Sequence, residues 1–208
     1  MSPNYFKGKT IVTFLAHPDD EALGCGGTLA RARNEGAEIH CVIPVKRIAS
    51  DCKKVMKKLD AKVHWGNFDD NSMDKYPLLD VCKFADNIIS SIKPDIVITH
   101  HSNCTNQDHR VCYEAASIVT KPLKRKIDLW TCEVLSSTGF LRPCSFEPNL
   151  YVGLSYAELD DKLEMVNMYE SELRADRSTG VVECLATLRG AESGNELAEG
   201  FMVVRSYV

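Results

Sequence analysis

Runs of consecutive apolar residues alternate with amphipathic segments along most of this chain. Consecutive apolar residues predict strands over 10–16, 38–43, 62–65, 95–100 and 128–134, with two more near 149 and over 201–206. Apolar residues that recur every three or four positions predict helices over 21–35, 50–59, 78–92, 108–120, 155–171 and 181–190. Pro44 and Pro94 are expected to end the elements before them, and Ser50 is expected to cap the helix that follows it.

This order of strands and helices predicts an α/β fold. The strands are apolar throughout rather than alternating, which is typical of a parallel sheet with helices on both faces. The chain has 208 residues, 44% of them hydrophobic, and it shows no internal repeat and no linker. We therefore expect residues 1–208 to form a single domain.

Charge and cysteine content narrow the possible functions. The net charge is −4 and the charged residues are well mixed, so neither a nucleic-acid partner nor a membrane surface is expected. No apolar stretch approaches the roughly 20 residues that span a bilayer, and the N-terminus lacks the apolar core of a signal peptide. Nine cysteines occur without a CxxC pair, which favours buried thiols in a reducing, cytoplasmic environment.

Polar side chains are concentrated where two of the predicted strands end. Ala16-His17-Pro18-Asp19-Asp20-Glu21 follows the first strand, and a second histidine-rich segment, 100–109, follows the strand at 95–100. Ligands of parallel sheets bind outside the carboxyl ends of the strands. The two segments are therefore expected to converge there, although about 80 residues separate them.

His17, Asp20 and His109 form a candidate metal site. Two histidines and one carboxylate, with a fourth position left to water, are the ligands of a catalytic zinc, although iron or cobalt would accept the same set. Asp19 should point away from Asp20 and could serve as a general base, while Asp108 or Glu21 could orient the imidazoles. The alternative is structural, because acidic residues in the first turn of a helix are also favoured by its dipole.

These residues resemble the PIG-L/LmbE family of zinc-dependent N-deacetylases. The hexapeptide is followed by a glycine-rich helix start, and Asp108-His109-Arg110 comes about 90 residues later. The loop 68–74 resembles the family's Phe-Pro-Asp-Asn-x-x-Asp loop, and the segments 169–174 and 188–194 resemble blocks of its bacterial sugar-pathway branch.

The resemblance implies a Rossmann-like, three-layer α/β/α fold with a mostly parallel sheet. It also implies that His17, Asp20 and His109 bind Zn²⁺ and that Asp19 is the general base. The implied activity is hydrolysis of an N-acyl group, above all acetyl, from an amino sugar such as N-acetylglucosamine or from a sugar nucleotide. Such a small molecule would be the partner, and a second copy of the chain, in a homo-oligomer, is a further candidate partner.

The chain departs from the family at two positions near the second histidine. Asn106 stands where relatives carry a histidine, and Cys104 stands where many carry an aspartate. Asn106 could donate a hydrogen bond to an oxyanion but cannot carry a proton. Either Asp19 acts as both base and acid, or His100 or His101 swings in, or activity is reduced; we favour the first. A metal- or sugar-binding relative with impaired catalysis is the alternative function.

Substrate contacts are expected from four residues, namely Arg47, Asn71, His101 and Arg189. Asn71 could instead form a turn, and Arg189 could instead pair with Glu192. Relatives continue from the segment 169–174 into a loop with proline and histidine, so a substrate contact is expected to be missing from 175–180 here. A third function, a nucleotide-binding oxidoreductase, would rest on Gly24-x-Gly26-Gly27, which lacks the GxGxxG spacing.

Overall fold

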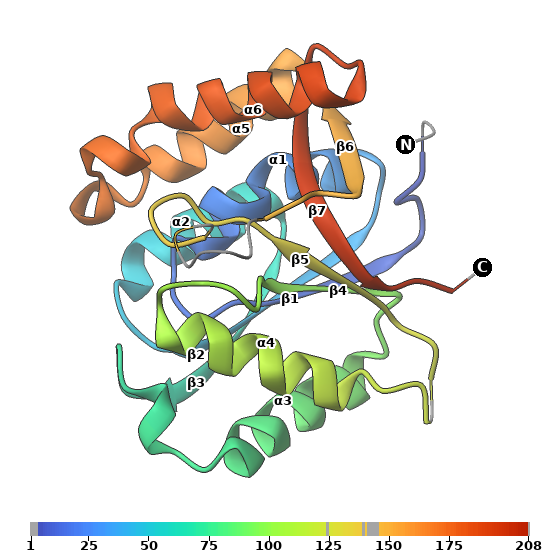
Figure 1. The fold of residues 1–208 in the computed structure, drawn as a ribbon, viewed down its shortest axis with the longest axis vertical. Coiled ribbons are helices and arrows are strands. Elements are labelled where there is room, and N and C mark those ends of the chain that lie inside the picture. The colour runs from blue at the N-terminus through green and yellow to red at the C-terminus, as the bar shows by residue number, and fades with distance from the viewer. Residues whose placement is uncertain (1–3, 124, 139, 141–145, 208) are drawn as a thin grey trace.

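A computed structural model describes residues 4–123, 125–138, 140 and 146–207. These residues form a seven-stranded sheet with the order β3-β2-β1-β4-β5-β7-β6 (Figure 1). The strands are β1 (Thr10–Phe14), β2 (Glu38–Val45), β3 (Lys62–Phe68), β4 (Ile96–His100), β5 (Asp128–Cys132), β6 (Leu150–Leu154) and β7 (Leu197–Arg205). Strands β1 to β5 run parallel, and β7 is antiparallel to both of its neighbours.

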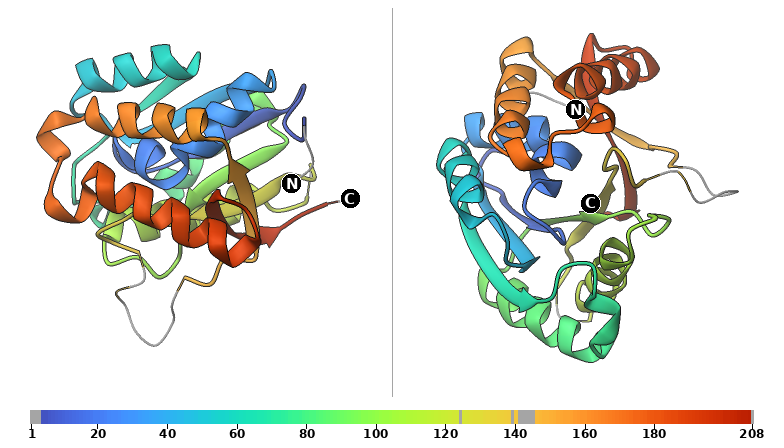
Figure 2. Two further views of the ribbon diagram at one scale, coloured as in Figure 1. Left: turned by 90° about the horizontal axis from the view of Figure 1, so that it is seen from above. Right: turned by 90° about the vertical axis from the view of Figure 1, so that its left-hand side faces the viewer.

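Helices cover both faces of this sheet (Figure 2). The helices are α1 (Asp20–Asn34), α2 (Ala49–Leu59), α3 (Leu78–Ile92), α4 (Gln107–Val119), α5 (Tyr156–Asn167) and α6 (Thr179–Ser193). One hydrophobic core lies between the sheet and α1, α2, α5 and α6, and the other lies between the sheet and α3 and α4. Neighbouring strand residues such as Ile11 and Val12 face opposite cores, so each strand is apolar throughout. The predicted three-layer α/β/α fold with a mostly parallel sheet is confirmed.

Two sequence-based boundaries around β2 are wrong. Strand β2 continues through Pro44 to Val45, because the pairing with β3 shifts register between Ile43 and Val45 and so accommodates a residue without an N–H. A Cβ on Gly66 would lie 2.4 Å from the Pro44 carbonyl oxygen, so this irregularity requires glycine. Ser50 is not the cap of α2 either, because the helix already begins at Ala49.

Helix α1 is interrupted at Cys25, where φ is −150° and ψ is 18°. A Cβ on Gly24 would lie 2.7 Å from Cys132 Sγ of β5, and one on Gly27 would lie 2.5 Å from Leu154 Cδ1 of β6. The glycines therefore let the helix pack closely on the sheet. This packing role accounts for the glycine pattern that a nucleotide-binding loop would otherwise explain.

No helix in the described part of the chain is both long enough and apolar enough to cross a membrane.

Candidate metal centre and the cavity beside it

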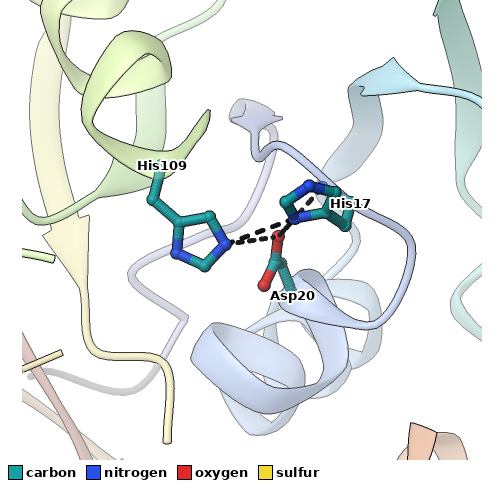
Figure 3. Close-up of side chains that lie close together, drawn as sticks. All are labelled: His17, Asp20 and His109. Atoms are coloured by element: carbon teal, nitrogen blue, oxygen red, sulfur yellow. Dashed lines mark hydrogen bonds and ion pairs between the residues drawn. The ribbon is translucent and has the colours of Figure 1, made fainter. Parts of the chain in front are cut away.

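His17, Asp20 and His109 meet beyond the carboxyl ends of β1 and β4. His17 lies between β1 and α1, Asp20 is the first residue of α1, and His109 lies in the first turn of α4. Figure 3 shows the two imidazole rings and the carboxylate facing one another. Asp20 Oδ2 lies 3.3 Å from His17 Nδ1 and 3.4 Å from His109 Nε2, and the two ring nitrogens are 3.3 Å apart. All three residues are buried.

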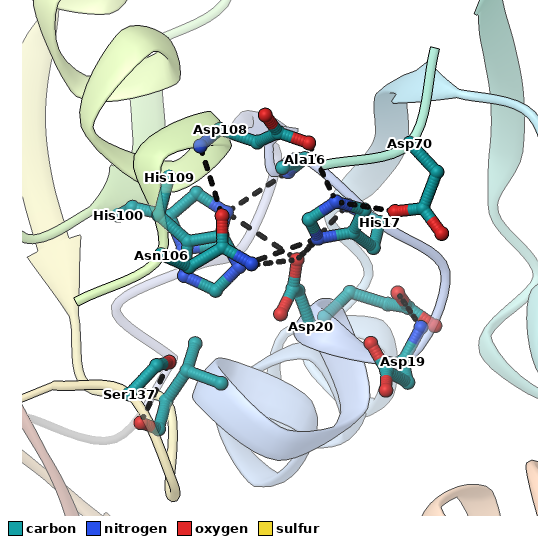
Figure 4. A network of polar contacts seen from close by, with 12 residues as sticks. Ala16, His17, Asp19, Asp20, Asp70, His100, Asn106, Asp108, His109 and Ser137 are labelled. Atoms are coloured by element: carbon teal, nitrogen blue, oxygen red, sulfur yellow. Dashed lines mark hydrogen bonds and ion pairs between the residues drawn. The ribbon is translucent and has the colours of Figure 1, made fainter. Parts of the chain in front are cut away.

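Each imidazole is held from its far side. His17 Nε2 lies 3.0 Å from Asp108 Oδ2 (Figure 4). The other oxygen of Asp108 accepts a 2.9 Å hydrogen bond from the Met73 backbone N–H. His109 Nδ1 lies 3.1 Å from Cys104 Sγ. Groups that bind the second ring nitrogen of a ligating histidine fix its orientation and tautomer. Asp108, one of the two residues that we predicted to orient an imidazole at the catalytic site, is thus placed to orient His17, and it is fully buried.

The charges within this cluster fit a bound cation. Burial alone would lower the pKa of His17, but hydrogen bonds to Asp108 and Asp20 raise it to about 9. Burial alone would also lower the pKa of His109, but the negative charge of Asp20 outweighs this effect and raises the pKa to about 10. The two histidines in turn hold the pKa of Asp20 well below its usual range despite its burial. The two ring nitrogens and the carboxylate oxygen also lie within 4.8 Å of one another, close enough for all three to bind one divalent metal.

Asp19 lies beside this cluster in an unusual backbone conformation. Its φ is 107°, a region that residues other than glycine rarely adopt, and its backbone N–H donates to Glu21 Oε2 at 3.2 Å. Tyr169 holds Glu21 in turn through a 2.5 Å hydrogen bond. Burial raises the pKa of Asp19 well above its usual range, and Asp20 adds to this, whereas Arg177 at 2.7 Å opposes it. The side chain is therefore a buried carboxyl group that can hold a proton.

A polar cavity of about 390 Å³ opens next to His17, Asp19 and Asp20. It is also lined by Arg47, Asp70, Asn71, Thr105, Asn106, Ser136, Ser137, Glu172, Arg174 and Arg177. Arg47 and Asn71, two of the predicted substrate contacts, are therefore at the site. The sequence analysis missed Arg174 and Arg177, and it expected 175–180 to lack a contact. The available signal was the pair of cations at the end of the family block 169–174 and just after it.

Asn106 caps α4 at the edge of this cavity. Its Oδ1 accepts a 2.8 Å hydrogen bond from the Asp108 N–H, and its Nδ2 donates to Asn71 Oδ1 at 3.3 Å. The side chain therefore orients the helix turn that carries His109. Its Nδ2 carries a second hydrogen besides the one that it donates to Asn71.

The remaining predicted contacts lie away from the cavity. His100 is fully buried, accepts a 2.9 Å hydrogen bond from the Ala16 N–H and stacks on His109 (Figure 4), so it cannot swing into the cavity without breaking this packing. His101 is buried against Phe146. Arg189 binds Glu133 through two hydrogen bonds of 2.7 and 2.8 Å and also pairs with Glu192. A substrate contact by His101 or Arg189 stays a prediction.

Several solved structures share this fold. N,N'-diacetylchitobiose deacetylase from Pyrococcus horikoshii is 18% identical with a TM-score of 0.78, over 98% of this chain and 86% of that one. The zinc-inhibited form of teicoplanin deacetylase Orf2 is 16% identical with a TM-score of 0.76, over 95% and 98%. GalB, the 4-carboxy-2-hydroxymuconate hydratase from Pseudomonas putida KT2440, is 17% identical with a TM-score of 0.75, over 97% and 98%.

Because a hydratase shares the fold with the deacetylases, fold alone does not identify the reaction. A comparison with curated protein sequences gives no match. The model of one family, described as PIG-L, GlcNAc-PI de-N-acetylase, matches residues 12–120, which include the whole candidate metal site. Since this match spans more than half of the 208 residues, the chain belongs to the PIG-L family.

Proposed function

We propose that this protein is a zinc-dependent hydrolase that removes an N-acyl group, above all acetyl, from an amino sugar or a sugar nucleotide. The observation that carries the proposal is the position of Asp19. A buried carboxyl group with a raised pKa lies beside a cluster of metal-ligand type and lines the same polar cavity. Membership of a de-N-acetylase family and the fold shared with sugar deacetylases support the same activity.

His17, Asp20 and His109 would hold the metal. When bound there, a divalent metal would polarise the amide carbonyl and make water more acidic. Asp108 and Cys104 would keep the two imidazoles in place through their second ring nitrogens.

Asp19 is the residue that moves the proton. As a carboxylate it accepts a proton from the attacking water, and as a carboxylic acid it returns that proton to the departing amine. Its burial favours the protonated form, while the Arg177 guanidinium at 2.7 Å favours the ionised form, so both forms are accessible. This explains how the reaction proceeds although Asn106 replaces the histidine of relatives. We propose that the free N–H of Asn106 contacts the oxyanion.

Arg47 and Asn71 are the proposed contacts to the substrate, since both line the cavity. Seven of the eight described cysteines are buried, and all eight are free thiols, which supports a reducing, cytoplasmic environment for this reaction.

A metal- or sugar-binding protein without catalytic activity is the second candidate. Asn106 favours it, because the amide cannot transfer a proton and one of its N–H groups is already bonded to Asn71. Full metal occupancy without amine release from any N-acyl amino sugar would support this candidate over the first.

Substitution of Asp19 tests the proposal. Asp19→Asn should keep the metal, measured by elemental analysis, yet lower the rate of amine release by about 10²-fold or more. His17→Ala and His109→Ala should instead lose the metal. Asp69→Asn is the matched control, because Asp69 is an exposed carboxylate that does not line the cavity. Unchanged turnover in Asp19→Asn with the metal retained would refute the role of Asp19.

A further inference from the structure

We infer that the substrate carries an anionic group, a carboxylate or a phosphate, close to its acylated nitrogen, and that Arg174 and Arg177 bind this group. The inference rests on the proposed function, because it specifies the substrate of the same cavity.

Three arginines line the cavity, and they come from two separate loops. Arg47 lies between β2 and α2, whereas Arg174 and Arg177 lie between α5 and α6. None of the described residues that line the cavity is apolar, so it does not suit an apolar substituent. Guanidinium groups bind carboxylates and phosphates through paired hydrogen bonds, which makes arginine the usual residue for such anions.

Two of the three arginines pair with carboxylates of the cavity, although Arg177 uses only its Nη1 for this. Arg47 binds Glu172 through two hydrogen bonds of 3.1 Å, and Arg177 binds Asp19 at 2.7 Å. Arg174 differs, because the carboxylate near it is Asp176, at 3.5 Å, and both side chains are more than half exposed. Such an exposed pair contributes little, so the Arg174 guanidinium is available to a ligand.

The carboxylates of the cavity are already engaged. Asp20 faces the histidine cluster and Glu172 is bound to Arg47. Asp70 lies 3.2 Å from His17 Nε2, which it shares with Asp108, and 3.7 Å from Arg47 Nη1. A substrate that enters the cavity therefore meets the positive charge of Arg174 without a matching buried carboxylate.

Arg174 and Arg177 converge on one hydroxyl group. Ser136 Oγ accepts a 2.8 Å hydrogen bond from Arg177 Nε and a 3.4 Å hydrogen bond from Arg174 Nη2. Two like charges held at one neutral oxygen repel each other, and an anion at this point would bind both. Ser136 has a φ of 77°, an uncommon conformation for serine, and such strained residues cluster at ligand sites.

This point lies close to the proposed reaction centre. A single guanidinium group, that of Arg177, contacts both Ser136 Oγ and Asp19 Oδ2. One guanidinium group therefore separates the proposed anion site from Asp19. We expect both groups on the same sugar ring or on its direct substituent, rather than at opposite ends of a long molecule.

Amine release from matched compounds tests this inference. N-acetylglucosamine is the neutral substrate, N-acetylglucosamine 6-phosphate supplies a phosphate, and N-acetylmuramic acid supplies a carboxylate. We expect kcat/KM to be at least about tenfold higher for one of the two anionic compounds, and which of them is preferred distinguishes phosphate from carboxylate.

Arg174→Gln should lower the ratio of anionic to neutral kcat/KM by about 10- to 100-fold, the loss expected for charge-assisted hydrogen bonds. Arg174→Lys should recover part of this preference, because lysine keeps the positive charge but cannot form the paired hydrogen bonds of a guanidinium group. Lys46→Gln is the matched control, because Lys46 is an exposed cation on the same loop as Arg47 and does not line the cavity. The preference should be unchanged in this control.

The outcomes separate this inference from the proposed function. Equal kcat/KM for neutral and anionic compounds, or a preference that survives Arg174→Gln, would overturn the inference and leave the deacetylase activity standing. If no compound releases amine, the proposed function fails, and calorimetric binding of glucosamine 6-phosphate and glucosamine to the zinc-loaded protein decides the inference. In that case the inference predicts that glucosamine 6-phosphate binds at least about tenfold more tightly than glucosamine, and that Arg174→Gln abolishes this difference. Equal binding of the two compounds would overturn the inference.

Discussion

The buried ion pair between Lys162 and Glu199 holds the two halves of α1 together. Glu199 accepts hydrogen bonds from the backbone N–H groups of Gly27 and Thr28 at 3.0 and 2.7 Å, and from Lys162 Nζ at 2.5 Å. Lys162 Nζ also donates to the Leu23 carbonyl at 2.9 Å. The pair therefore binds backbone groups on both sides of the break at Cys25, where the regular hydrogen bonds within the helix are interrupted.

Removing the charge of Glu199 should destabilise the protein strongly. Both side chains are at most 5% exposed, so Glu199→Gln leaves an ammonium group buried without a counter-ion. Breaking a buried pair in this way costs about 3–5 kcal/mol of unfolding free energy. The double variant Lys162→Met/Glu199→Gln removes the uncompensated charge as well. We expect it to be more stable than Glu199→Gln alone by at least about 1 kcal/mol.

Urea unfolding at one fixed metal concentration measures these differences. Glu196→Gln is the control, because this exposed carboxylate precedes the same strand and should change the unfolding free energy by no more than about 0.5 kcal/mol. A loss below about 1 kcal/mol in Glu199→Gln would refute the reasoning, since that is the cost of an exposed pair. A double variant less stable than the single one would refute it too.

Two further predictions concern the metal centre. Cys104→Ala removes the group 3.1 Å from His109 Nδ1 and should lower the affinity for zinc by about 10- to 100-fold, measured by competition with a chromophoric chelator; unchanged affinity would show that the thiol does not support His109. The metal-free protein should lose stability as the pH rises from about 6.5 to about 10, because folded His17 and His109, with pKa values of about 9 and about 10, retain protons that the unfolded chain releases. The loss should reach at least roughly 1.4 kcal/mol, the equivalent of one pKa unit, and a flat profile of thermal unfolding over this range would contradict it.

The fold could be predicted well from the sequence, because each strand is indicated by a local run of apolar residues. Apolar runs such as 95–100 have few alternatives to a buried strand, and both histidine-rich segments follow directly from strand ends. The convergence of His17 and His109 could therefore be inferred from the rule that parallel strands end at one edge. The boundaries that failed, at Pro44 and Ser50, depend on a register shift and on turn geometry that hydropathy does not encode.

The surroundings of the site were harder to predict, because they depend on long-range contacts. Arg177 reaches Asp19 across 158 positions of sequence, and no local pattern indicates such a pair. Arg189 illustrates the converse, because its position in a family block predicted a substrate contact, whereas its guanidinium is bound to Glu133. Asn106 was considered as an oxyanion donor, and its role as the cap of α4 became visible only with the helix boundary.

The central claim is that a metal held by His17, Asp20 and His109 acts with Asp19 to release an amine from an N-acyl amino sugar. The most direct measurement is amine release from N-acetylglucosamine and its 6-phosphate by protein that has been stripped of metal and then titrated with zinc. We predict no release from the stripped protein and activity that rises with zinc until one equivalent is bound. Release that is unaffected by stripping, or no release from either compound with one equivalent bound, would contradict the claim.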